Sequence, residues 1–219
     1  MMRHGELPAS KLAYLELLRA ATAVEFDIEE LALKIKHEAS LTFRLLRYLN
    51  SAAFGLRSEV HSVTHALSLL GERELRKWIA VVSVGVLADE KPDELMTVPL
   101  VRGRFCEILA PLAGLAGHAN DLFLMGLLSV IDAILDQPLE TILVELPVRL
   151  EIKEALLSQK GVYSRLLEIA VAHEFAEWDK VSAIAQETRM SEERISAMYV
   201  EAVDWSRALG RSVQAPVAK

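Results

Sequence analysis

Apolar residues at helical spacing between residues 40 and 71 constrain the fold more than any other feature of the chain. Leu41, Leu45 and Leu49 would share one face of a helix, because residues four apart are neighbours on a helix surface. A second helix is predicted to begin at Ser62 and to end at Gly71, with apolar residues at the same spacing. The pattern predicts two helices packed as a hairpin.

Small and polar residues mark the ends of this hairpin. Ser40 is expected to cap the first helix, because its hydroxyl can accept a hydrogen bond from a backbone N–H of the first turn. Gly55 is expected to have a positive φ in the connection, where a residue with a side chain would be strained. Phe54 and Val60 are expected to close the turn.

The rest of the chain is also predicted to be helical. It has only seven prolines and ten glycines in 219 residues, and the apolar–polar alternation typical of strands is scarce. We expect an all-α fold with a single compact multi-helix domain at residues 9–210, between a flexible lead-in at 1–8 and a flexible tail at 211–219. Asp121–Leu135 is apolar almost all round, which predicts a continuous helix at the centre of the core.

Three adjoining segments carry a family resemblance. They are RLLRYLNSAAFG from Arg44, HSVTHALSLLG from His61 and ERELRKW from Glu72. Together they resemble the HDOD domain family of bacterial signalling proteins, above all members in which this domain follows an EAL domain of the cyclic-di-GMP phosphodiesterase type. The resemblance extends from about residue 12 to about residue 209. It implies an HD-domain-like helical core, derived from metal-dependent phosphohydrolases, without their metal site.

The resemblance places the His-Asp ligand pair of catalytic HD domains on Ser129 and Val130. Valine has no donor atom for a metal, and none of the six histidines of this chain is followed by aspartate. Metal-dependent phosphate hydrolysis needs several converging His and carboxylate ligands. We therefore expect no catalytic residue, no metal and no cofactor.

Two residue pairs have the spacing of metal ligands without the rest of a ligand set. His61 and His65 are four residues apart, but Ser62 stands where a zincin helix has glutamate. Asp132 and Asp136 are one helical turn apart, and no third ligand is identifiable near them. A solvated helix end is the favoured interpretation of the aspartate pair.

Five basic residues are candidates for binding a partner. They predict a basic edge along two helices of a chain whose net charge is −7. Such an edge would dock an acidic partner or an anionic ligand such as a nucleotide. The alternative is a solvated helix face neutralised by neighbouring glutamates. The candidates are Arg44, Arg47, Arg73, Arg76 and Lys77.

A nucleic-acid partner is not expected. Val181–Val200 has the sequence pattern of a helix-turn-helix. However, Glu192 and Glu193 lie at the start of its second helix, where their negative charges would repel the phosphates of a nucleic acid. The net negative charge argues the same way. A terminal helical hairpin is the favoured interpretation.

The remaining features favour a cytoplasmic protein without a membrane segment. The longest uncharged stretches fall short of the ~20 residues that a membrane span needs, and the N-terminal residues have no signal-peptide pattern. Cys106 has no partner for an internal disulfide and is expected to be a small buried apolar residue.

The functional prediction is a non-enzymatic module for regulation or protein interaction in bacterial signal transduction. Its expected partner is another protein or an upstream EAL domain, which would couple it to cyclic-di-GMP signalling. The alternative is a metal-dependent phosphohydrolase acting on a nucleotide or phosphodiester. The oligomeric state stays open.

Overall fold

The fold is all-α, as predicted. The computed structural model describes residues 9–51, 54 and 59–213, and this part of the chain contains helices and no strand. The helices are α1 (Ala9–Thr22), α2 (Ile28–His37), α3 (Ala39–Leu49), α4 (Val63–Leu87), α5 (Glu94–Leu109), the short 3-10 helix η1 (Ala116–His118), α6 (Ala119–Leu128), α7 (Ile131–Leu135), α8 (Leu139–Glu145), α9 (Leu150–Ser158), α10 (Gly161–Glu174), α11 (Trp178–Thr188) and α12 (Glu192–Val213).

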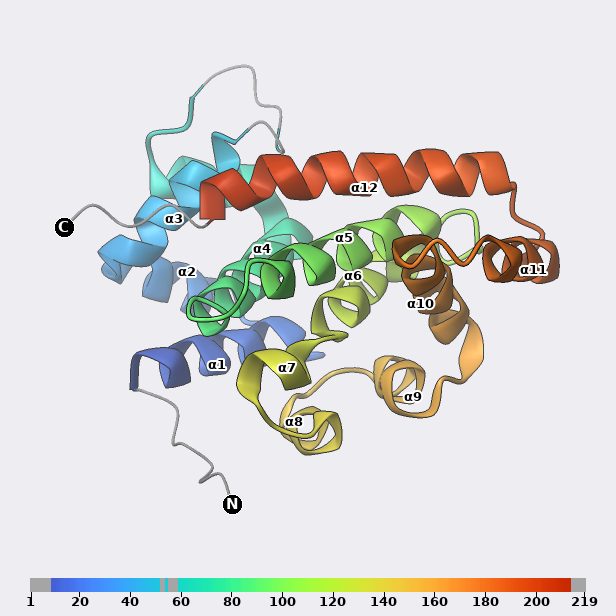
Figure 1. Ribbon diagram of the computed structural model, residues 1–219. Coiled ribbons are helices and arrows are strands. Elements are labelled where there is room, and N and C mark those ends of the chain that lie inside the picture. The colour runs from blue at the N-terminus through green and yellow to red at the C-terminus, as the bar shows by residue number, and fades with distance from the viewer. Residues whose placement is uncertain (1–8, 52–53, 55–58, 214–219) are drawn as a thin grey trace.

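The middle of the molecule is formed by α4, α5 and α6 (Figure 1). Helix α5 packs against α6 and α12, α1 packs against α4, and α9 packs against α10. The long helix α12 runs along one side of the molecule and also contacts α3, so both ends of the chain share one core. Helix α12 continues to Val213, past the expected domain boundary at 210. In the part of the chain described here, no helix is both long and apolar enough to span a membrane.

The predicted hairpin is present as α3 and the first part of α4. Leu41, Leu45 and Leu49 are buried, which confirms the predicted apolar face. The predicted cap is wrong, because α3 begins at Ala39 after an extended Glu38, and the Ser40 hydroxyl donates to the Glu38 carboxylate at 2.8 Å. The prediction for Gly55 falls outside the described residues.

Asn50 fastens the connection between the two helices. Its Nδ2 donates to the Val60 carbonyl at 2.9 Å, and the Val60 N–H donates to its Oδ1 at 2.8 Å. Val60 is buried, and the Phe54 ring meets the Tyr48 ring edge-on at 5.6 Å. Phe54 and Val60 therefore close the turn as predicted, and Asn50 explains how the two ends of the connection are held together.

Gly71 divides α4 into two helical segments. Its φ of 64° and ψ of 176° are not helical, and a positive φ suits a residue without a side chain. The predicted helix end at Gly71 is confirmed as this kink. The segment after the kink buries Leu75, Trp78 and Ile79 in the core.

Two glycines let α5 and α6 approach closely. A Cβ added at Gly126 would lie 2.5 Å from the backbone of Arg102 and Gly103, and one added at Gly103 would lie 2.9 Å from the Phe123 carbonyl oxygen. Real Cβ contacts are not this short, so a side chain at either position would push the helices apart. This contact brings Arg102 beside the end of α6.

The predicted central helix is not continuous. Helix α6 ends at Leu128 and α7 starts at Ile131, so Asp121–Leu135 breaks at Ser129 and Val130. The Ser129 hydroxyl donates to the Gly126 carbonyl at 2.7 Å, and Val130 has a non-helical φ of −131°. The sequence did not show this break, because apolar residues continue across it.

Candidate functional site

The five basic residues predicted to bind a partner do not form one solvated edge. The Lys77 side chain is only 4% exposed, so its expected outward position is wrong. The Arg76 side chain is 13% exposed, whereas that of Arg73 is 59% exposed. Arg44 and Arg47 lie on α3 and are partly exposed, with the Arg47 guanidinium 5.4 Å from the Phe43 ring.

Arg76 ties α4 to the end of α1. Its guanidinium donates to the carbonyls of Ala23 and Val24, and its Nε donates to Glu72 at 3.0 Å. The guanidinium also lies 4.3 Å from the centre of the Phe26 ring. These contacts engage Arg76 within the fold, so it is a structural residue in this arrangement.

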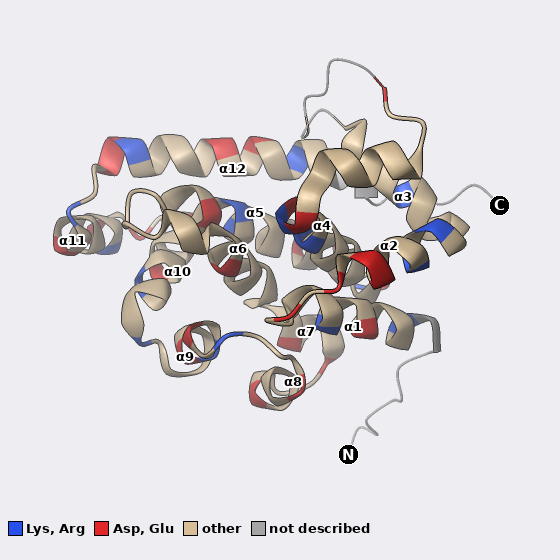
Figure 2. Ribbon diagram, turned by 180° about the vertical axis from the view of Figure 1, so that it is seen from behind, with Lys and Arg blue, Asp and Glu red and all other residues tan. Residues whose placement is uncertain are grey.

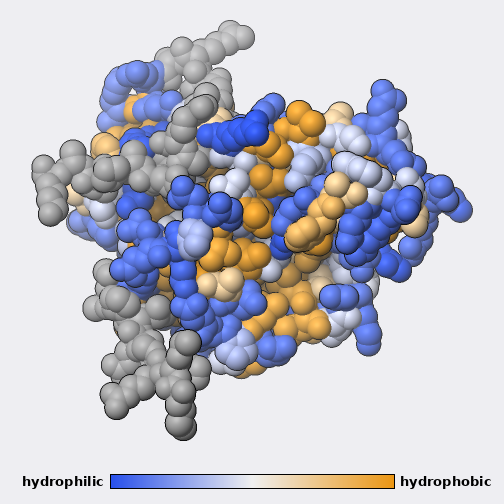
Figure 3. Space-filling view, viewed as in Figure 1, coloured by the Kyte–Doolittle hydropathy of each residue, from blue (hydrophilic) through white to orange (hydrophobic). Residues whose placement is uncertain are grey.

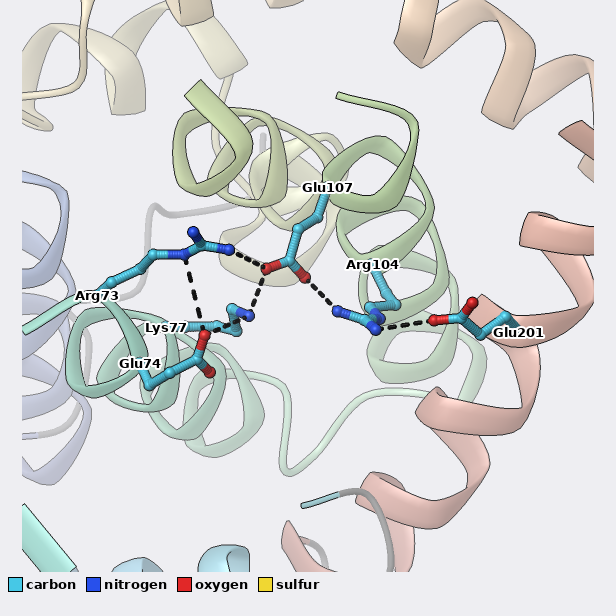
Figure 4. A network of polar contacts seen from close by, with 6 residues as sticks. All are labelled: Arg73, Glu74, Lys77, Arg104, Glu107 and Glu201. Atoms are coloured by element: carbon cyan, nitrogen blue, oxygen red, sulfur yellow. Dashed lines mark hydrogen bonds and ion pairs between the residues drawn. The ribbon is translucent and has the colours of Figure 1, made fainter. Parts of the chain in front are cut away.

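Lys77 belongs to a network of charged side chains between α4, α5 and α12. Figure 4 shows the three cations and three carboxylates converging between these helices. The network consists of Arg73, Glu74 and Lys77 from α4, Arg104 and Glu107 from α5, and Glu201 from α12. Because their formal charges cancel, the network adds no net charge to the interior.

Glu107 is the centre of this network. Its carboxylate lies 2.5 Å from the Lys77 Nζ, 3.0 Å from the Arg104 guanidinium and 3.6 Å from that of Arg73. Its side chain is only 3% exposed, so it needs these cations to offset the loss of hydration. Burial chiefly, and then the nearby Glu74 and Glu107 carboxylates, raise the pKa of Tyr48 and keep its phenol protonated. The network thus joins the part of α4 after its kink to α5 and α12.

A second ion pair occupies the place that the resemblance assigns to the His-Asp pair. Arg102 binds Glu174 through two contacts, at 2.8 and 3.1 Å, and its Nη1 donates to the Ser129 hydroxyl at 3.1 Å. Val130 beside Ser129 is half-buried. The two residues therefore lie next to a guanidinium from α5 and a carboxylate from α10.

These residues do not fit the metal centre of a catalytic HD domain. Such a centre needs several imidazole and carboxylate donors around a cation. Here an arginine cation lies against Ser129, and Glu174 is already engaged by it. Over the described ranges, no three His, Cys, Asp or Glu side chains are grouped so as to hold a metal ion.

The other candidate ligands lie apart from this position. The His61 side chain is 79% exposed beside Glu59, before α4 begins, and His65 is exposed on that helix. Asp136 has a left-handed backbone at the end of α7 and pairs with Lys91 at 2.6 Å. The arrangement matches the solvated helix end favoured from the sequence.

Two buried groups do not take part in either ion-pair system. Burial raises the pKa of the Cys106 thiol to about 12, and its Sγ lies 3.7 Å from the Leu166 carbonyl oxygen. A thiol of this kind stays protonated and unreactive. The His173 ring lies among Phe105, Trp178 and Tyr199, with centroids 5.2 to 5.5 Å away. Burial lowers the pKa of this imidazole.

The segment that imitates a helix-turn-helix is a packed hairpin of α11 and α12. Ile184, Met190 and Ile195 are buried within it. The Glu192 carboxylate accepts a hydrogen bond from the Ser182 hydroxyl at 2.8 Å, which links the two helices. This is the terminal hairpin favoured from the sequence.

A cavity of about 400 Å³ lies where the end of α1, the kink of α4 and the starts of α6 and α9 meet. Arg73, Arg76 and Arg149 contribute positive charge to its lining, and Glu72 and Asp121 contribute negative charge. The sequence pointed to Arg73 and Arg76 but not to Arg149, which follows 73 residues later. No pattern in the sequence connects these positions.

The outer surface mixes charges and apolar residues. In the view of Figure 2, basic and acidic positions are interleaved along the helices. On the face seen in Figure 3, apolar residues are exposed among hydrophilic ones in the middle of the view. Large exposed apolar side chains from α8 to α12 include Val144, Leu150, Phe175, Trp178 and Val200.

Two curated proteins are similar to nearly the whole chain. A cyclic di-GMP phosphodiesterase of Vibrio cholerae, CdgJ, is 28% identical over 199 residues, which are 91% of this chain and 46% of that protein. An uncharacterised protein of Bacillus subtilis, YuxH, is 30% identical over 200 residues, which are 90% of this chain and 48% of that protein. The chain thus spans about half the length of these relatives.

A solved structure and a family model complete the comparison. The solved structure, a Shewanella amazonensis protein provisionally described as a metal-dependent phosphohydrolase, is 14% identical. It aligns over 96% of this chain and 91% of its own, with a TM-score of 0.42. The family model for the HDOD domain matches residues 7–145, from the lead-in to the end of α8. Because this match covers more than half of the chain, the chain belongs to the HDOD domain family.

Proposed function

We propose that this chain is a non-catalytic regulatory module that acts through protein contacts in cyclic-di-GMP signalling. The observation that carries the proposal is the ion pair of Arg102 with Glu174, hydrogen-bonded to Ser129. A guanidinium held at this place repels a metal cation and engages the nearest carboxylate. The charged side chains that the interior offers therefore stabilise helix packing and do not converge on a substrate.

The link to the nucleotide rests on the relatives. One of them is named a cyclic di-GMP phosphodiesterase, and this chain corresponds to less than half of it. We propose that the chain works beside an EAL-type domain, on a longer polypeptide or as a separate protein in the cytoplasm. The chain would then change the activity of that domain and would have no hydrolytic activity itself.

The proposed contact surface is the exposed side of α3. The Arg44 and Arg47 side chains are partly exposed there, and the Phe43 ring beside Arg47 is 41% exposed. Arginine and aromatic side chains are enriched at protein interfaces. A partner with an acidic patch around an apolar pocket would fit this surface.

A co-purification experiment tests the proposal. Tagged chain and a variant with R44E and R47E are used to capture partners from the source cells, and each candidate is then purified and its binding measured. We expect one partner to bind the wild type directly and the double variant much more weakly, while R207E, a reversal on an exposed arginine of α12, leaves binding unchanged. Thermal unfolding of both variants checks that they are folded. If no purified partner distinguishes the wild type from the R44E/R47E variant, the proposed surface is wrong.

A further inference from the structure

We propose that the cavity between α1, α4, α6 and α9 binds a small phosphate ester of about the size of a mononucleotide. The proposal deepens the regulatory function by naming the chemical class of its signal, and it rests on that function only for its biological role. Binding itself follows from the charges, helix ends and polar atoms that meet in the cavity. No catalytic step is involved.

The volume of the cavity suits a small ligand. At about 400 Å³ it lies near the lower end of the range of about 300–1,000 Å³ that is typical of ligand pockets. Its lining comes from four separate segments of the chain, which include Ala23 after α1 and Gly117 of η1. A pocket of this kind is concave on several sides, so it can surround a ligand.

Two arginines in the lining, Arg73 and Arg149, have guanidinium N–H groups that could donate hydrogen bonds to a ligand. The ion pairs of Arg73 with Glu107 and Glu74, at 3.6 and 4.0 Å, are longer than hydrogen bonds. The contact of Arg149 with Asp121, at 3.6 Å, is also longer than a hydrogen bond. Both side chains are well exposed, at 59% and 43%. Guanidinium groups bind phosphate through paired N–H donors, and a ligand phosphate would engage these arginines at shorter distances.

Arg76 has a different role in the cavity. Its guanidinium is held by hydrogen bonds to the carbonyls that follow α1 and to Glu72. Its position in the cavity lining, and with it the position of its positive charge, is therefore fixed. With Arg73 and Arg149, Arg76 gives three cations against the two carboxylates of Glu72 and Asp121. The lining itself thus carries more cations than carboxylates, while Glu107 and Glu74, which lie outside it, balance part of the Arg73 charge.

Three helix starts add to the positive potential. Asn120 and Asp121 belong to the first turn of α6, Arg149 directly precedes α9, and Arg73 lies in the first turn after the kink of α4. A helix N-terminus carries a partial positive charge and backbone N–H donors, and it therefore favours phosphate groups. The kink at Gly71 is what brings a helix start to this place in the middle of α4.

The cavity also offers contacts for the part of a ligand that is not phosphate. Asn120, which is half-buried, contributes a polar amide side chain to the lining. Leu124 and Ile152 provide an apolar part of the lining for the face of a ring. These contacts favour a phosphate ester with a polar ring over inorganic phosphate.

Titration calorimetry on the purified chain tests the inference, with GMP, AMP, guanosine and inorganic phosphate as probes. We expect at least one nucleotide to bind with a dissociation constant below about 1 mM, and guanosine and inorganic phosphate to bind more weakly. Binding should weaken about tenfold or more in R149Q and in R73Q, because hydrogen bonds to a charged group are lost. R207Q, on the exposed surface of α12, is the matched control and should bind as the wild type.

A second kind of variant blocks the cavity without removing a charge. Gly117 is exposed and has no positive φ, and a Cβ added to it meets no atom within 4 Å, so G117L should fold and fill the space. It should abolish nucleotide binding, whereas G117S should retain it.

Absence of nucleotide binding, or binding that survives R149Q and G117L, would overturn the inference. Inorganic phosphate that binds as tightly as the nucleotides would overturn the assignment to an ester. None of these results affects the co-purification experiment, which tests the regulatory role separately.

Discussion

Replacement of Glu107 by leucine tests whether the buried charges are a structural unit. Glu107 offsets the charge of Lys77 at 2.5 Å and accepts from Arg104 at 3.0 Å, with its own side chain 3% exposed. Leucine has a similar volume, so the main effect is electrostatic. In E107L, Lys77 stays buried with Glu74 at 3.1 Å as its remaining carboxylate, and the network is left with one excess positive charge.

The expected cost follows from this geometry. Removal of one partner of a buried ion pair costs about 3–5 kcal/mol, because the other charge is left without compensation. Since Glu74 still neutralises part of the Lys77 charge, we expect a loss near the lower end, about 3 kcal/mol. K77M should cost less, because Glu107 keeps its contact with Arg104.

The double variant K77M/E107L makes the test specific. It removes both buried charges, while Arg104 keeps Glu201 at 2.8 Å. Its loss should be smaller than the sum of the two single losses by about 1–3 kcal/mol. Urea unfolding followed by circular dichroism and tryptophan fluorescence gives the three free energies, and E193L on an exposed part of α12 is the control, with a change within about 0.5 kcal/mol. A loss below about 1 kcal/mol in E107L, or strict additivity in the double variant, would refute the reasoning.

Three further predictions concern other parts of the core. G126A should destabilise the chain by about 1–3 kcal/mol in denaturant unfolding, because the new methyl would overlap the backbone of α5; an unchanged midpoint would mean that the helices are further apart. Cys106, with its pKa raised to about 12 by burial, should not react with a thiol reagent at neutral pH until the chain is unfolded, and fast labelling of the native protein would contradict this. The pKa of His173 is lowered by burial, so below its unfolded value of about 6.5 the unfolded chain binds more protons and stability falls as the pH decreases. In H173F the stability should fall less between about pH 7 and pH 5, and an identical pH dependence would show that His173 is not responsible.

Helix positions were predictable because their signals are local. The spacing of Leu41, Leu45 and Leu49 identified the buried face of α3, and Gly71 marked the kink in α4. Asp27 with Glu30 has the pattern of a capping box at the start of α2, and the Asp27 carboxylate accepts the N–H groups of Glu29 and Glu30. Each of these features depends on residues within one or two helical turns.

Features that depend on distant residues were not predictable. Lys77 looked like a surface residue among charged neighbours, and only its contact with Glu107, thirty positions away on α5, explains its burial. At the break, Ser129 accepts a hydrogen bond from Arg102, which the close contact of α5 with α6 brings near. The substitution of Ser129 and Val130 for a ligand pair came from the family resemblance, whereas the ion pair beside them came from the structure.

The candidate ligand cavity illustrates the same limit. Arg73 and Arg76 were identified as basic residues, but on an edge along two helices. The cavity needs Arg149 and Asn120 as well, which enter through the packing of α6 and α9. The composition of the sequence and the spacing of its residues do not show which distant segments pack against one another.

An activity assay with metal ions tests whether this chain lacks hydrolytic activity, as proposed. The purified chain is supplied with manganese or ferrous iron, and hydrolysis of cyclic-di-GMP and of a chromogenic phosphodiester is followed beside samples with metal alone. We expect the same rate with and without the chain, both for the wild type and for R102A, in which Glu174 is released from its arginine. Hydrolysis that requires the wild-type chain and is lost in E174Q would show that the chain is an enzyme and would identify the position of Ser129 and Glu174 as a catalytic centre.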